Sequence, residues 1–216
     1  MKNYCLKVFI LFLIILVILV STNVSANLPL SGKLIVVDAG HGAKDPGTMY
    51  RNIYEKDINL KISLALEKEL SRLGASVILT RDGDYDLSTP NTNHRKKSDF
   101  DNRIKLINES KADMYLSIHL NYLSDSSYYG AQVFYNQENE LIASKIQEYL
   151  NENLNSDREI KKIPSNTYMY NKLKIKGVLI ECGFLSNNKE RNLLINKEYQ
   201  QVLAKTIAQG VSYYYQ

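Results

Sequence analysis

Short apolar runs alternate with amphipathic segments along most of the chain. Apolar or alternating runs rich in β-branched residues predict strands at 33–38, 76–80, 113–121, 131–136 and 177–184. Apolar residues at helical spacing predict helices at 56–75, 99–110, 139–154, 188–196 and 197–215. Residues 155–176 fit neither pattern. The alternation of strands and helices predicts one α/β domain, with helices on both faces of a largely parallel sheet.

Two helix ends carry signals of their own. Gly74 follows the last apolar residue of the first predicted helix and is expected to stop it. Ser98 or Asp99 is expected to cap the second helix, because a short polar side chain accepts a hydrogen bond from the first turn. A long polar loop, at 83–98, precedes that helix.

The first 26 residues form a separate segment. Two lysines without an acid precede an apolar block from Val8 to Val20, and Val24-Ser25-Ala26 follows as a small-x-small cleavage pattern. This order is typical of a secretory signal. A membrane-spanning helix needs about 20 apolar residues, so a cleaved signal fits better than the alternative, an uncleaved anchor. In both cases the sequence predicts that residues 27–216 are exported, as a secreted or membrane-anchored domain in the cell-wall space.

Charge and cysteine content narrow the function classes. Without residues 1–26 the chain keeps 25 Lys and Arg against 23 Asp and Glu, a net charge of +2. A charge so near zero gives no case for nucleic-acid binding. Cys182 is the single cysteine beyond the signal, so the domain cannot form an internal disulfide and depends on its apolar core.

Polar residues stand where three of the predicted strands end. His41 follows "IVVDAG", His119 follows "YLSI" and Glu181 follows "VLI", while Glu55 opens the helix after the His41 loop. Sites in open α/β sheets form beyond the carboxyl ends of the strands, so these side chains are expected to meet. Two histidines and a carboxylate are typical ligands of a catalytic zinc with an open position, and a further carboxylate can act as general base.

Each of these residues also has a simpler interpretation. A strand-end histidine is often a hydrogen-bonded structural residue, and Glu55 could serve only the dipole of its helix. Glu181 is harder to explain in this way, because its strand is otherwise apolar and a buried carboxylate needs a partner or a metal. The residues alone leave open which glutamate is the metal ligand and which is the base.

Four motifs in order resemble the zinc-dependent N-acetylmuramoyl-L-alanine amidases of the Amidase_3 type. They are "IVVDAGHGAKDPGT", Glu55, "SIHLN" and "VLIECGFLSN", and the similarity runs from about Lys33 to the C-terminus. The resemblance implies that His41, Glu55 and His119 bind one zinc ion per chain and that Glu181 is catalytic. It also implies hydrolysis of the amide between the lactyl group of N-acetylmuramic acid and the L-alanine of the stem peptide in peptidoglycan.

Weaker assignments follow from the same motifs. Asn121 matches the family pattern and is expected to support a ligand, contact substrate or cap its loop. Asp38 is expected either to orient His41 or to hold the loop through backbone hydrogen bonds. Arg103 matches an arginine that recurs in the family, without a role that the sequence defines. His94 lies in the solvated loop and is interpreted as non-ligating, and Cys182 as a small buried hydrophobe.

The chain departs from the family pattern in ways that bear on its biological role. Lys176-Gly177 stand where a proline commonly precedes the last motif strand, and the sequence contains no wall-binding repeat. A single catalytic domain with only a signal most resembles the CwlD-type subgroup, which acts on spore-cortex peptidoglycan before muramic-δ-lactam formation. Such a domain is expected to depend on a protein partner or activator at the membrane face.

Three rival functions use the same residues. A non-haem iron oxygenase also uses two histidines and one carboxylate. The export signal and the extra glutamate argue against it. A non-catalytic wall-binding protein of the same fold is disfavoured because all four polar positions are intact. A zinc peptidase that cuts within the stem peptide would differ only in its products.

Overall fold

The main sheet of the described residues is parallel at its centre. The structure, a computed structural model, describes residues 28–136, 138–154 and 156–216. Its six strands lie in the order β4–β1–β5–β8–β6–β7. In that order they span Ser76–Leu79, Leu34–Ala39, Met114–Asn121, Gly177–Phe184, Gln132–Tyr135 and Lys161–Lys162. The first four are mutually parallel, which confirms the predicted α/β class.

The edge beyond β8 runs in the other direction. β6 pairs antiparallel with β8, and β7 pairs parallel with β6. A parallel crossover takes a dozen or more residues, usually with a helix. The connection from β5 to β6 at 122–131 is shorter and holds no helix, so β6 returns antiparallel.

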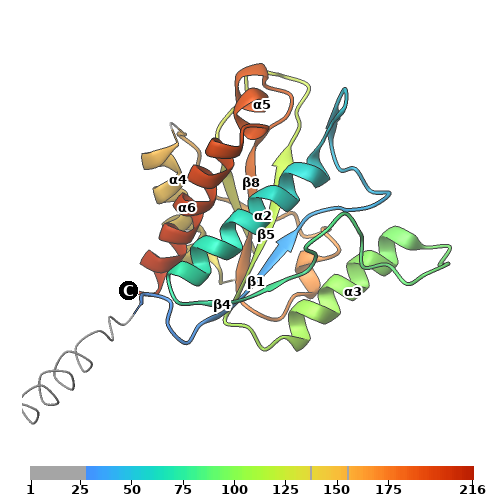
Figure 1. The fold of residues 1–216 in the computed structure, drawn as a ribbon, viewed down its shortest axis with the longest axis horizontal. Coiled ribbons are helices and arrows are strands. Elements are labelled where there is room, and N and C mark those ends of the chain that lie inside the picture. The colour runs from blue at the N-terminus through green and yellow to red at the C-terminus, as the bar shows by residue number, and fades with distance from the viewer. Residues whose placement is uncertain (1–27, 137, 155) are drawn as a thin grey trace, which may run out of the picture.

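Helices cover both faces of the sheet, as the sequence predicts (Figure 1). On one face lie α2 (Glu55–Arg72), α4 (Glu140–Asn153) and α6 (Lys197–Tyr214), and α6 packs against both of the others. The other face carries α3 (Arg95–Glu109) and a single 3₁₀ turn, η1 (Tyr170–Lys172). A short helix, α5 (Asn188–Leu194), follows β8 and leads into α6.

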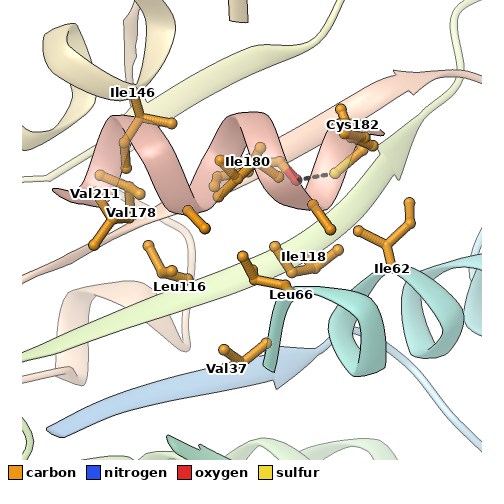
Figure 2. Packing of buried hydrophobic residues seen from close by; sticks show 14 of the residues in the cluster. Val37, Ile62, Leu66, Leu116, Ile118, Ile146, Val178, Ile180, Cys182 and Val211 are labelled. Atoms are coloured by element: carbon orange, nitrogen blue, oxygen red, sulfur yellow. Dashed lines mark hydrogen bonds between the residues drawn. The ribbon is translucent and has the colours of Figure 1, made fainter. Parts of the chain in front are cut away.

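The larger core lies between the sheet and the three-helix face. Alternate residues of β1, β5 and β8 point into it, among them Val37, Leu116 and Ile180 (Figure 2). Ile62 and Leu66 of α2 meet them at helical spacing and are fully buried. Burial of each such side chain contributes about 1.5–3 kcal/mol, so this layer fixes the strands that carry the site. Cys182 is buried in the same layer, as expected of a small hydrophobe.

The opposite face of the same strands is more polar. Val36 and Tyr115 pack there against Ile107 of α3 and Tyr170 of η1. The next positions along these faces are Asp38 and Ser117, both almost fully buried. The polar end of this layer therefore lies toward the carboxyl ends of β1 and β5.

Several boundaries differ from the sequence-based expectations. α3 begins at Arg95 with His94 before it, so neither Ser98 nor Asp99 is the N-cap. The Asp99 carboxylate instead accepts hydrogen bonds from Arg103 and from the amide of Leu87, and Ser98 Oγ accepts one from the amide of Thr89. These tertiary contacts outweigh local capping. The segment 155–176, which fits no pattern, contains β7 and η1.

A two-stranded hairpin leads into α2. Its strands, β2 (Met49–Tyr50) and β3 (Ile53–Tyr54), pair antiparallel, and each is too short to show a sequence periodicity. Tyr50 stacks under the guanidinium of Arg191 of α5, at 3.5 Å from the ring centroid. The hairpin is thereby held against the segment that follows β8.

The predicted export signal, residues 1–26, lies outside the described residues. Among the helices that the structure does describe, none is long and apolar enough to cross a membrane.

Candidate metal centre and catalytic site

Four polar side chains gather at the carboxyl end of the parallel strands. His41 follows β1, His119 lies near the end of β5, and Glu181 lies on β8 in register with His119. In-register residues of neighbouring strands point to the same side of a sheet. Glu55 is the first residue of α2 and is almost fully buried. The structure thus brings together all four residues that the sequence singles out.

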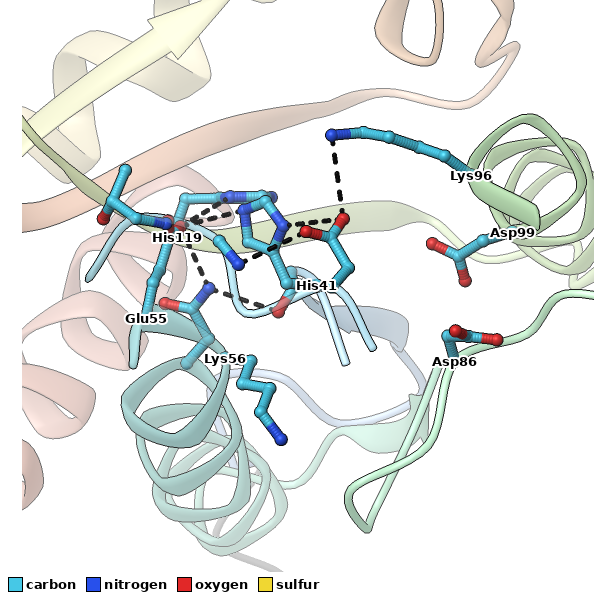
Figure 3. Close-up of polar contacts among 12 residues, drawn as sticks. His41, Glu55, Lys56, Asp86, Lys96, Asp99 and His119 are labelled. Atoms are coloured by element: carbon cyan, nitrogen blue, oxygen red, sulfur yellow. Dashed lines mark hydrogen bonds and ion pairs between the residues drawn. The ribbon is translucent and has the colours of Figure 1, made fainter. Parts of the chain in front are cut away.

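The two imidazoles flank one oxygen of the Glu55 carboxylate (Figure 3). His41 Nε2 is 3.2 Å and His119 Nδ1 is 3.0 Å from Glu55 Oε1. One ligand atom from each of the three residues lies within 4.8 Å of the others. Glu55 itself is fixed from behind, because the amides of Leu120 and Thr48 donate to its Oε1 and Oε2 at 3.0 and 2.7 Å.

Two glycines leave room for this cluster. A Cβ on Gly40 would lie 2.4 Å from His119 Nε2, and one on Gly47 would lie 2.5 Å from Glu55 Oε2. Such contacts are far shorter than any van der Waals distance, so only glycine fits at these positions. Gly42 is required for a different reason: a Cβ there would lie 2.3 Å from the carbonyl oxygen of Tyr85, so a side chain would clash with the neighbouring loop. Of the two glycines that flank His41, one therefore serves the cluster and the other the neighbouring loop.

Asp45 orients His41, a contact that the sequence analysis does not predict. Its Oδ2 is 3.1 Å from His41 Nδ1, on the side of the ring away from Glu55. Burial lowers the pKa of His41, but the hydrogen bonds to Asp45 and Glu55 outweigh burial and raise it to about 9. Without a metal, His41 is then protonated at neutral pH, and a metal ion would displace that proton. The spacing of four residues between His41 and Asp45 is the only signal of this pair in the sequence.

Glu181 is held in an environment that favours its protonated form. Burial, then the nearby charge of Glu55, raises its pKa to about 8, although His41 acts in the opposite direction. Within the described residues, its buried Oε2 has no hydrogen-bond partner. A buried carboxylate oxygen without a partner is costly unless a cation or a reacting molecule completes its surroundings.

Asp38 and Arg103 lie beneath the cluster. Both are almost fully buried. Asp38 accepts hydrogen bonds from Arg103 Nη1, Ser117 and Thr80, at 2.7, 2.7 and 2.8 Å. Arg103 donates in turn to the carbonyl of His41 at 2.7 Å. The Asp38 carboxylate thus contacts neither the His41 ring, which pairs with Asp45, nor the loop backbone directly, and it reaches that backbone only through Arg103.

The two remaining polar residues named from the sequence, Asn121 and His94, lie outside the cluster of four. Asn121 Oδ1 accepts a hydrogen bond from the amide of Tyr122 at 2.8 Å, as a loop cap does, and the side chain is partly exposed. His94 is exposed at the start of α3. Asn121 is thus next to the site, whereas His94 belongs to the solvated loop.

The donor set fits a zinc ion. Two imidazole nitrogens and one carboxylate oxygen make up a catalytic zinc site, which keeps a further position for water or substrate. The buried carboxylate of Glu55 and the partly buried ones of Glu181 and Asp45 supply negative charge around this point. The glycine gaps at Gly40 and Gly47 let the donors approach one another.

Sequence comparison identifies the class of protein that carries this fold and site. The Amidase_3 family model, described as N-acetylmuramoyl-L-alanine amidase, matches residues 35–213. The chain belongs to this family, which confirms the resemblance found in its motifs.

Individual relatives narrow the position within the family. The chain is 41% identical over 221 residues to the germination-specific N-acetylmuramoyl-L-alanine amidase of Bacillus subtilis, covering 96% of this chain and 93% of the relative. Among solved structures, the CwlD amidase of Clostridioides difficile, in complex with the GerS lipoprotein, matches with a TM-score of 0.80 and 38% identity, over 85% of this chain and 98% of that one. The catalytic domain of the CwlV amidase from Bacillus (Paenibacillus) polymyxa var. colistinus matches with a TM-score of 0.73 and 32% identity, over 84% and 97%. The similarity to CwlD agrees with the subgroup expected from the motifs.

Proposed function

We propose that this protein is a zinc-dependent amidase in which His41, Glu55 and His119 hold one zinc ion and Glu181 is the general base. The observation that carries the proposal is the joint placement of two imidazoles, a fixed carboxylate and an unpartnered carboxylate at one sheet edge. When bound there, zinc would polarise the scissile carbonyl and lower the pKa of water.

The protein's own side chains would hold the ligands in place and transfer the proton. Glu55 keeps its place through two backbone amides, and His41 through Asp45. Glu181 takes a proton from the attacking water and returns it to the leaving amine. Glu181, whose pKa is raised in the absence of metal, would be ionised at neutral pH with a dication bound nearby and so able to accept that proton.

The proposed substrate is the bond named by the family: the amide between the lactyl group of N-acetylmuramic acid and the L-alanine of the stem peptide. Digestion of purified muropeptides by the zinc-loaded protein, followed by mass spectrometry, tests this. We expect free stem peptides with an N-terminal L-alanine and glycan with unsubstituted muramic acid. Fragments cut between two residues of the stem would instead identify a peptidase.

Asp45 gives a second test of the metal site. Asp45→Asn keeps a hydrogen bond to His41 but removes the charge that favours the correct orientation and basicity of the imidazole. Loss of such a partner weakens metal binding by about 10–100-fold. Competition with a chromophoric chelator should show this loss, and excess zinc should restore much of the activity. Unchanged zinc affinity would contradict the role given to Asp45.

We further propose that the protein is exported and acts on spore-cortex peptidoglycan, where removal of stem peptides precedes muramic-δ-lactam formation. The supporting points are the signal-like residues 1–26 and the similarity to a germination-specific amidase. Deletion of the gene in the native sporulating host, followed by muropeptide analysis of the cortex, tests this role. A cortex with normal muramic-δ-lactam content would contradict it.

A protein partner at the membrane face belongs to the same proposal. Its support is that the CwlD relative is seen in complex with a lipoprotein. The muropeptide digestion also tests this point. Full hydrolysis by the purified protein alone, with zinc retained through dialysis, would argue against dependence on a partner.

A further inference from the structure

The loop that carries His41 has an unusual backbone. His41, Gly42 and Ala43 have φ values of 64°, 141° and 47°, so three consecutive residues lie at positive φ. For residues with a side chain this region is sparsely populated and energetically unfavourable. Such a conformation persists only where surrounding contacts over-determine it.

Two buried arginines supply those contacts. Arg81 Nε and Nη2 donate to the carbonyls of Ala39 and Gly40, both at 2.9 Å. Arg103 Nη1 and Nη2 donate to the carbonyls of Ala39 and His41, at 2.8 and 2.7 Å. The carbonyls of Ala39, the last residue of β1, and of the next two residues, Gly40 and His41, thus all accept hydrogen bonds from guanidinium groups.

Arg81 and Arg103 connect this loop to different parts of the site. Arg81 Nη2 also donates to the carbonyl of Lys56, the residue after Glu55, at 2.7 Å. Arg103 is tied to α3 through Asp99 and to β1 through Asp38. Arg81 therefore joins the His41 loop to α2, the helix that carries Glu55, and Arg103 joins the same loop to α3 on the opposite face of the sheet.

The positive charge of Arg103 is neutralised by two buried aspartates, Asp38 and Asp99, that contact it directly. Its side chain is 2% exposed, and those of Asp38 and Asp99 are 1% and 3% exposed. Burial disfavours the cation, but the two carboxylates outweigh this and raise the pKa of Arg103 further above its usual range. A buried and matched cation of this kind has a fixed geometry, which a flexible surface residue lacks.

We propose that Arg103 is a positioning residue for metal binding: it holds the carbonyl of His41 so that the strained loop presents the imidazole to the metal. Arg81 supports the preceding carbonyls. This inference rests on the proposed zinc site and adds to it a residue that does not touch the metal.

The role requires the guanidinium fork. Arg103 donates to Asp99, Asp38 and His41 O from three different nitrogens. A lysine keeps the positive charge but offers a single nitrogen on a shorter side chain. Arg103→Lys is therefore expected to retain charge pairing with a buried aspartate and to lose the contact with His41 O.

The experiment compares the full chain with Arg103→Lys by zinc affinity and by the visible absorption spectrum after substitution with Co²⁺. We expect the dissociation constant for zinc to rise at least about tenfold, the lower end for groups that orient a ligand. The Co²⁺ bands should shift, because the field at the metal changes when His41 moves.

Ser117→Ala is the matched control. It removes a 2.7 Å hydrogen bond from the other oxygen of Asp38 and leaves Arg103 and the His41 loop in contact. The control should lose thermal stability, measured in EDTA, but keep the zinc affinity and Co²⁺ spectrum of the parent.

Each failure has a different signature. Equal zinc affinity and spectra in Arg103→Lys and the parent would overturn the inference, as would equal losses in Arg103→Lys and Ser117→Ala. Absence of zinc binding in the parent would instead overturn the metal site, and the inference with it. If Arg103→Lys does not fold, the same measurements on Arg81→Lys decide between these outcomes, since Arg81 bonds the two preceding carbonyls.

Discussion

Glu181→Gln is expected to lower the rate of amide hydrolysis by at least about 10²-fold while zinc content stays near that of the parent. Glutamine keeps the size of the side chain and most of its hydrogen bonding, but it cannot accept a proton from water. His41, Glu55 and His119 remain in place, so the metal donors are unchanged. Turnover of muropeptides at saturating zinc and metal analysis of the same sample measure both effects.

Glu55→Gln is the matched comparison, because it makes the same change in the other glutamate of the site. This variant should lose zinc, since Glu55 Oε1 lies between the two imidazoles. If Glu181→Gln empties the metal site and Glu55→Gln keeps it filled, the two glutamates have exchanged the roles assigned here.

His119→Ala is expected to abolish measurable activity and to release most of the zinc. One of three protein donors disappears, so the loss of affinity should exceed the roughly 100-fold that removal of a supporting partner can cause. The fold should persist, because the His119 side chain is partly exposed and the apolar residues of β5 around it are unchanged. Zinc content after gel filtration and circular dichroism of the same preparation measure the two properties.

His94→Ala serves as its control. His94 is an exposed histidine before α3, so its removal should leave turnover within a few-fold and zinc content unchanged. Stoichiometric zinc in His119→Ala, or a loss in His94→Ala as large as that in His119→Ala, would refute the ligand assignment.

The sequence predicts the centre of this molecule well. The strands at 33–38 and 177–184 and the long helices α2 and α6 are strongly patterned, so periodicity alone places them. His41, His119 and Glu181 stand out because each interrupts or ends an apolar run, and Glu55 because it opens the helix after the His41 loop. Those interruptions are visible in a sequence, and the parallel arrangement of β1, β5 and β8 then brings their ends to the same edge.

Several contacts that the sequence did not predict join residues that lie far apart in the chain. Asp99 has the composition of an N-cap, yet α3 begins four residues earlier, and the Asp99 carboxylate accepts a hydrogen bond from the amide of Leu87. Arg81 stands at the start of a polar loop, and its pattern gives no sign that it bonds the carbonyl of Gly40. Local propensity cannot anticipate such contacts, because only the folded chain brings the partners together.

The position of β8 in the sheet has a consequence for the order in which the site can form. β8 comes late in the chain but lies between β5 and β6, so the sheet has no continuous centre until β8 inserts. Contacts between distant segments form slowly, because the intervening chain must be closed into a loop first. A growing chain that ends before β8 already contains His41, Glu55 and His119 but not Glu181. With Glu181 as the proposed general base, such an unfinished chain would hold all three metal donors and still be unable to hydrolyse the amide.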